Sequence, residues 1–189
     1  MQLTAPTPSE KSKFSPCPAG SYAAVCTQVI DLGTSQTNFL DEHTGQPKFA
    51  HSVRFTFEVN EMMQDGRPFV VSQELTLSMH EKAKMRQFLS NWRGKDFGPG
   101  ESVNLKDLIG KGCSLSIVEY TKKNGEVGTK IGSISCLMKG MEVPKPANPT
   151  IYFDLEAFDE DTYAQLPQWL QDKIAGSQEF KNINAEASF

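Results

Sequence analysis

The chain has 189 residues, of which 38% are hydrophobic and 22% are charged, and its formal net charge is −4. No apolar run approaches the roughly 20 residues that a membrane-spanning helix needs, and the first residues lack the basic start and apolar stretch of a secretory signal. The sequence therefore predicts a soluble, cytoplasmic protein with one main folded domain, since domains usually contain about 100–200 residues.

The negative charge is concentrated in the C-terminal quarter. Residues 1–140 contain 16 Lys and Arg against 14 Asp and Glu, a net of +2, whereas residues 141–189 contain 3 against 9, a net of −6. A local basic surface on the body is compatible with a nucleic-acid partner, and acidic tails often serve as interaction segments. A solvated acidic end explains the same counts equally well.

The first part of the chain predicts a flexible arm and three strands. Residues 1–19 are rich in Pro, Ser and Lys and cannot build a core. Strand signals follow over 22–32, 53–59 and 69–77. In the second of these strands the odd positions are apolar and the even positions polar, which predicts one face in the core and the other in water.

A helix and two further strands complete the predicted body. Ser78 and Glu81 have the spacing of a capping box, so a helix of about four turns is expected to begin there and to end at Gly94. A short helical turn is expected near 105–109. Two strands, over 113–120 and 128–137, are joined by an Asn-Gly turn of the hairpin type.

The last quarter of the chain predicts a smaller unit. Three prolines between positions 144 and 149 mark a linker, 151–155 can add an edge strand, and apolar spacing predicts a helix over 166–174. The expected organisation is an arm over 1–19, a barrel domain over 20–140, an acidic extension with a helix over 141–176, and a flexible tail over 177–189.

The order of these elements predicts an all-β fold with one or two helices. Three strands, a helix and two strands are the order of an OB-fold, a five-stranded Greek-key barrel that commonly binds oligonucleotides. The helix then lies between strands three and four, and the second predicted helix lies C-terminal to the barrel. Fold alone does not fix function.

Three segments resemble a known family. Pro18-Ala-Gly-Ser-Tyr-Ala-Ala-Val-Cys26, the stretch from Leu75-Thr-Leu-Ser-Met-His-Glu-Lys-Ala83 to Trp92-Arg-Gly-Lys95, and Leu166-Pro-Gln-Trp-Leu170 are similar to bacteriophage replication-module proteins. The resemblance covers most of residues 16–180. It implies an OB-fold protein that binds single-stranded DNA, but these segments are structural signposts and do not locate a binding site.

Single-strand binding needs a basic groove and exposed aromatic rings on which bases stack. Two groups of residues meet this description. One lies in and after the first long loop: Phe39, Lys48, His51 and Arg54. The other lies around the last hairpin: Tyr120, Lys122, Lys123 and Lys130. Against this interpretation, Phe39, Phe49 and Phe69 are also suited to plugging the barrel ends, and charged hairpin tips are usually only solvated.

Other kinds of site are weakly indicated. The four cysteines, Cys17, Cys26, Cys113 and Cys136, lack zinc-ligand spacing, and no nucleophile motif or phosphate-binding loop is present. We therefore expect no metal, no cofactor and no catalysis. Phe189, the last residue of the sequence, follows an acidic segment and is a candidate partner-binding residue.

Two hypotheses follow from the sequence. In the first, the chain binds single-stranded DNA without sequence preference in phage replication or recombination, with replication proteins as possible partners of its acidic segment. In the second, it is an OB-like adaptor that binds a replication or host-defence protein without contacting DNA. No membrane partner is expected, and the sequence leaves the oligomeric state open.

Overall fold

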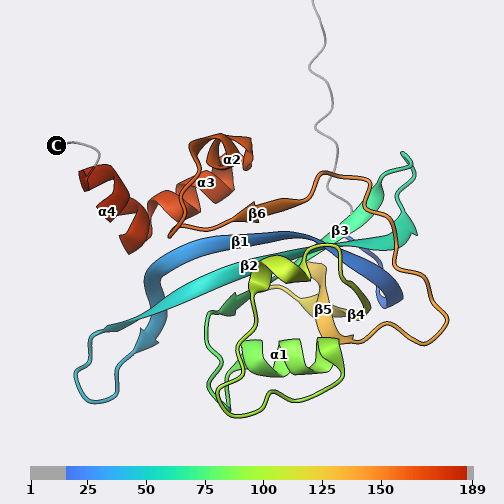
Figure 1. The fold of residues 1–189 in the computed structure, drawn as a ribbon, viewed down its shortest axis with the longest axis horizontal. Coiled ribbons are helices and arrows are strands. Elements are labelled where there is room, and N and C mark those ends of the chain that lie inside the picture. Colours follow the sequence, from blue (N-terminus) through green and yellow to red (C-terminus); the bar gives the residue numbers. More distant parts are fainter. Residues whose placement is uncertain (1–15, 187–189) are drawn as a thin grey trace, which may run out of the picture.

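The computed structural model describes residues 16–186 and is built on one strongly curved sheet (Figure 1). Five antiparallel strands lie in the order β3-β2-β1-β4-β5, and β6 pairs in parallel with β1. The strands are β1 Gly20–Leu40, β2 Pro47–Met62, β3 Pro68–Thr76, β4 Gly112–Thr121, β5 Val127–Ser135 and β6 Ile151–Phe153. Within residues 16–186 the outer strands β3 and β5 are not hydrogen-bonded to each other, so the sheet is open along this seam.

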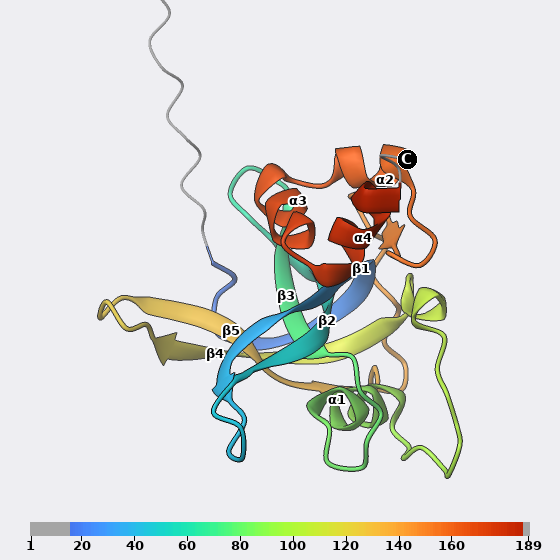
Figure 2. The same ribbon diagram turned by 90° about the vertical axis from the view of Figure 1, so that its left-hand side faces the viewer.

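Helices lie at one open side of the sheet and on its outer face (Figures 1 and 2). They are α1 Lys84–Arg93, the short 3₁₀ helix η1 Leu105–Leu108, α2 Glu160–Gln165, α3 Gln168–Ala175 and α4 Gln178–Glu186. The mostly β architecture and the expected position of α1 between β3 and β4 are confirmed. The C-terminal segment, however, forms three helices where the sequence indicated one.

The long first strand joins two hydrophobic cores. Its 21 residues bend because the pairing with β2 shifts register at three places, one of them next to Gly33, whose φ of +68° is unfavourable for other residues. Val29 points into the main core beneath α1, whereas the neighbouring Ile30 points into a second core on the other face. Strand alternation thus lets one strand serve both cores.

The main core fills the inside of the curved sheet. Phe57 of β2 and Trp92 of α1 pack edge to face, with ring centroids 5.2 Å apart, and Phe55 and Phe57 are fully buried. The second core lies between β1 and the C-terminal helices and contains Ile30, Leu32, Phe153, Leu155, Leu166, Leu170 and Ile174. Residues 151–186 are therefore packed onto the sheet (Figure 2).

The polar face of β2 is covered, which corrects the expectation that it is in water. Thr56 is 5% exposed and Glu58 is 2% exposed. The Glu58 carboxylate accepts hydrogen bonds from the backbone amides of Ala147 and Asn148, at 2.7 and 2.9 Å, and from the Asn148 side chain. The segment after β5 crosses this face, and its amides satisfy the buried charge.

The start of α1 also differs from the sequence prediction. Ser78 and Glu81 both precede the helix, which begins only at Lys84, with Ala83 at its N-cap and no side-chain cap. The Ser78 hydroxyl accepts from the amide of His80, so it forms a local turn, an alternative that competes with capping. The predicted end is confirmed, because Gly94 adopts the left-handed conformation at the C-cap.

Residues 178–186 form α4 where the sequence indicated a loose polar tail. Phe180 and Ile183 of this helix pack against the second core. Within residues 16–186, no helix is long and apolar enough to cross a bilayer.

Candidate nucleic-acid interface

The hairpin between β1 and β2 exposes two aromatic rings. Phe39 is 74% exposed and Phe49 is 55% exposed, with Lys48 beside Phe49. Asp41 organises the tip, because its carboxylate accepts from the amides of His43 and Thr44, both at 3.0 Å. These hydrogen bonds hold the pKa of the Asp41 carboxyl below its ordinary value. The tip is thus an ordered turn with apolar rings in water.

The alternative role of barrel plug applies to only one of the three phenylalanines considered. Phe69 packs against the main core, as a plug would. Phe39 and Phe49 do not, and Leu40, which follows Phe39, is also 61% exposed, so the hairpin exposes three large apolar side chains. Extended apolar patches mark interaction sites, whereas single exposed apolar residues are ordinary.

The hairpin between β4 and β5 carries an aromatic ring beneath a lysine. The Lys130 ammonium lies 5.3 Å from the centroid of the Tyr120 ring, a cation–π arrangement. Tyr120 pairs across the strands with Gly128, and a Cβ added at Gly128 would lie only 3.1 Å from the tyrosine ring. The ring therefore rests on bare backbone, which fixes its orientation while leaving it 39% exposed.

The same hairpin ends in two further lysines. The Lys122 ammonium is 3.3 Å from the Glu126 carboxylate, an exposed ion pair, whereas Lys123 has no ion pair or hydrogen bond to its side chain within residues 16–186. The turn contains the expected Asn124-Gly125 pair, with Gly125 at a φ of +84°. Tyr120, Lys122, Lys123 and Lys130 are thus brought together as the sequence indicated.

The structure does not bring His51 and Arg54 into either hairpin tip. They lie further along β2, and each contacts a C-terminal helix. The Arg54 guanidinium is 3.0 Å from the Glu74 carboxylate and 4.9 Å from the centroid of the Trp169 ring of α3. The His51 imidazole is 2.5 Å from Asp31 and 3.5 Å from Glu179 of α4. Both side chains hold the C-terminal segment in place.

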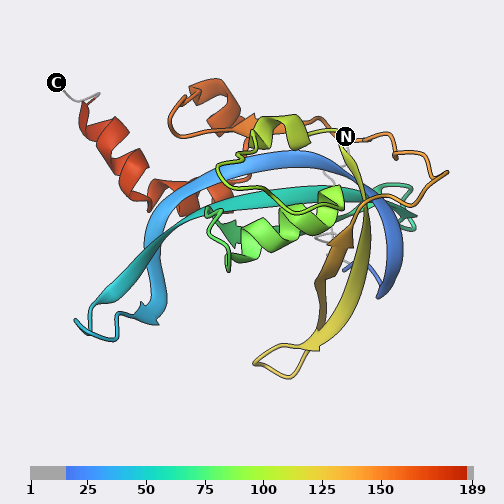
Figure 3. The same ribbon diagram turned by 60° about the horizontal axis from the view of Figure 1, so that its bottom comes forward.

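The two hairpins project beyond the rest of the sheet (Figures 2 and 3). Each is a two-stranded extension of strands whose other ends are anchored in the main core, so their tips are held by rigid elements. Their exposed rings and amines have the properties that base stacking and phosphate contact require. Phe49 is not among the DNA-binding candidates that the sequence suggested, where it was considered with Phe39 and Phe69 as a possible plug of the barrel ends, but it is 55% exposed.

Thiols and possible metal ligands are also present among the described residues. Residues 16–186 contain no group of three or more His, Cys, Asp or Glu side chains placed to hold a metal ion. All four cysteines are free thiols, and burial raises the pKa of Cys26 to about 12, so that this thiol is protonated at neutral pH. Phe189, the candidate partner-binding residue, lies outside the described residues.

Comparison with known protein families finds none that the chain matches. A comparison with curated proteins likewise finds no match.

Proposed function

We propose that the chain binds single-stranded DNA without sequence preference, through the tips of the β1–β2 and β4–β5 hairpins. The observation that supports this most directly is the exposure of three aromatic rings on ordered hairpins, Phe39, Phe49 and Tyr120, with the Lys130 ammonium over the ring of Tyr120. Stacking of one base on one such ring contributes about 1–3 kcal/mol, and every base has a face that can stack.

The proposal includes an OB-type barrel as the architecture. The strand order β3-β2-β1-β4-β5, with α1 between β3 and β4, supports it. In OB-folds the loops between strands one and two and between strands four and five contact oligonucleotides, and these are the two hairpins that carry the exposed rings. The resemblance of three segments to phage replication-module proteins supports a role in phage replication or recombination.

The charge distribution of the protein limits the path that bound single-stranded DNA can take. The acidic first turn of α2, Glu160 and Asp161 with Asp159 at the N-cap, lies on the side of the sheet opposite α1 (Figure 1). Phosphates are repelled there and attracted by the lysines of the hairpins. A DNA single strand that contacts both hairpin tips avoids the acidic helices. Its binding therefore involves few phosphates, and the affinity is moderately sensitive to salt.

A titration of the whole protein against a fluorescent single strand tests the proposal. We expect the anisotropy of an oligonucleotide of about 30 nucleotides to rise on binding, with an affinity that falls as salt increases. Unlabelled single strands of unrelated sequence should compete equally well, and duplex DNA should compete poorly. A flat titration at low salt by folded protein would contradict the proposal and favour the adaptor hypothesis.

A further inference from the structure

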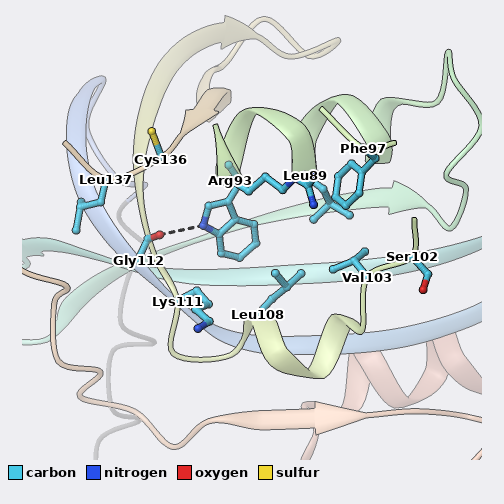
Figure 4. A pocket seen from close by; sticks show the side chains of 11 residues that line it. Leu89, Arg93, Phe97, Ser102, Val103, Leu108, Lys111, Gly112, Cys136 and Leu137 are labelled. Atoms are coloured by element: carbon cyan, nitrogen blue, oxygen red, sulfur yellow. Dashed lines mark hydrogen bonds between the residues drawn. The ribbon is translucent and has the colours of Figure 1, made fainter. Parts of the chain in front are cut away.

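The end of β4 away from the β4–β5 hairpin tip borders an apolar cavity. The cavity, of about 290 Å³, opens between α1, η1 and the start of β4 (Figure 4). Leu89 and Trp92 of α1 form one wall, and Val103 and Leu108 form the other. Phe97 lies at one end of the cavity and Leu137 at the other.

The polar groups that line this cavity are mostly satisfied by the protein itself. The Trp92 indole N–H donates to the carbonyl of Gly112 at 2.9 Å, which fixes the ring in its wall of the cavity. The Arg93 guanidinium stacks 3.8 Å from the Phe97 centroid and forms an ion pair with Glu101 at 2.6 Å. That pairing helps to hold the pKa of Glu101 at about 2, so the carboxylate and the guanidinium neutralise each other at neutral pH.

Lys111, unlike Trp92 and Arg93, has a side chain whose polar group is not satisfied by the part of the protein that the structure describes. It is exposed at the rim, and its ammonium has no ion pair or hydrogen bond within residues 16–186. An apolar cavity with one unpaired cation at its edge is complementary to an apolar group that has a negative charge next to it.

Exposed apolar residues extend the surface beyond the cavity. The segment that leaves Leu137 contains Met138, Met141 and Val143, which are 66%, 39% and 47% exposed. Val143 lies against Gly112, since a Cβ added to that glycine would lie 2.8 Å from the valine side chain. The strip therefore adjoins the cavity wall, and methionine side chains adapt readily to the shape of a bound partner.

We propose that the cavity and this strip together bind an acidic peptide segment of another protein. One large apolar side chain of the peptide enters the cavity against Trp92, an adjacent carboxylate pairs with Lys111, and the rest of the peptide lies over Met138 and Met141. Buried aromatic or aliphatic anchors in such pockets dominate many interfaces.

This site is separate from the proposed DNA interface. Gly112 at the cavity and Tyr120 at the hairpin are eight residues apart on β4, which corresponds to about 26 Å along an extended strand. A peptide in the cavity and single-stranded DNA on the hairpins can therefore be bound at the same time. The peptide site does not depend on DNA binding.

The test uses short fluorescent peptides and the full chain. The main probe has a central Phe between Asp and Glu residues, one matched probe replaces Phe by Ala, and another replaces the acids by Lys. The main variant is Cys136→Trp, which fills the mouth of the cavity from an exposed position, with Cys136→Ser as its matched control. Lys111→Glu reverses the charge at the rim. Urea unfolding midpoints establish that each variant is folded.

We expect the acidic Phe peptide to bind the wild type and Cys136→Ser alike, and to bind Cys136→Trp and Lys111→Glu at least about tenfold more weakly. Both matched peptides should also bind weakly. Equal binding of all three peptides, no binding of the acidic Phe peptide, or full binding by Cys136→Trp would overturn the proposal. Self-association of the chain that is lost in Cys136→Trp would instead assign the cavity to a second copy, and would also overturn it.

Discussion

Arg54 is a candidate DNA contact by sequence, but its side chain stabilises the fold. As a cation on the polar face of β2 it has the properties of a DNA contact. In the folded protein its charge is paired with Glu74, and its guanidinium lies against Trp169. Lys173 of α3 reaches the same carboxylate at 2.5 Å. Arg54 is thus part of the contact between the sheet and α3.

Replacing Arg54 separates its two possible roles. We expect Arg54→Met to lower the free energy of unfolding by about 1 kcal/mol, because it removes a partly exposed ion pair and a cation–π contact. The affinity for single-stranded DNA should change by less than about twofold. Urea unfolding and anisotropy measure the two effects. A large loss of DNA affinity at unchanged stability would place Arg54 in the interface and contradict this assignment.

At the scale of elements, α3 shows how a helix with mixed composition is held on the sheet. Leu170 and Ile174 are buried in the second core, whereas Trp169 is 52% exposed. An isolated helix of this length is only marginally stable in water, so its order depends on these buried contacts.

Neighbouring positions of α3 therefore provide a matched pair of variants. Leu170→Ala should reduce the free energy of unfolding by about 2–5 kcal/mol, since it leaves a cavity in the second core. Trp169→Ala removes a larger side chain that is half in solvent, and it should cost about 1 kcal/mol, the scale of a lost cation–π contact. Chemical denaturation of both variants gives the comparison. Equal losses would show that the second core does not depend on this face of α3.

The contact between α4 and the sheet depends on the charge of Glu179. Its carboxylate accepts from the amide and the hydroxyl of Thr34, at 2.6 and 2.5 Å, and it faces His51. Burial acts to raise the pKa of Glu179, but the hydrogen bonds from Thr34 and the charge of His51 outweigh it, so the pKa lies below its ordinary value of 4.5.

This shift gives a pH dependence with a defined sign. A carboxyl whose pKa is lowered by folding binds fewer protons in the folded state, so its contribution to stability is present above the unfolded-state pKa and is lost as pH falls through the folded-state value. We expect Glu179→Gln to speed amide hydrogen exchange in 178–186 at neutral pH, and to make little difference in acid, where the wild type is protonated. A difference that grows in acid would contradict this account.

For the whole molecule, the sequence predicts the strands of the sheet better than the segments and helices that pack on them. The alternation over 53–59 and the Asn-Gly turn identify strands through local patterns, and these strands are confirmed, although the polar face of β2 is covered and not in water. The covering of Glu58 depends on amides about 90 residues further along the chain, which no local pattern can show. The start of α1 was mispredicted because Ser78 satisfies its own turn.

The sequence of the C-terminal segment does contain features that are typical of a helix. Phe180 and Ile183 are three residues apart, the spacing of one helical face, and Ser177 accepts from the amide of Phe180 as a helix cap does. For the candidate interface, residue types and loop positions identified the β4–β5 cluster. They did not distinguish Phe49, which is exposed, from Phe69, which packs on the core, because both flank turns.

The central claim is that the two hairpin tips bind single-stranded DNA, and one comparison tests it most directly. Anisotropy titrations would compare the wild type, a variant with Phe39→Ala, Tyr120→Ala and Lys123→Ala, and a control with Met62→Ala, Leu77→Ala and Lys82→Ala, which truncates exposed side chains elsewhere. We predict that the hairpin variant loses at least about 2 kcal/mol of binding free energy, since two stacking rings are removed, while the control binds like the wild type. Equal binding by all three folded proteins would contradict the claim.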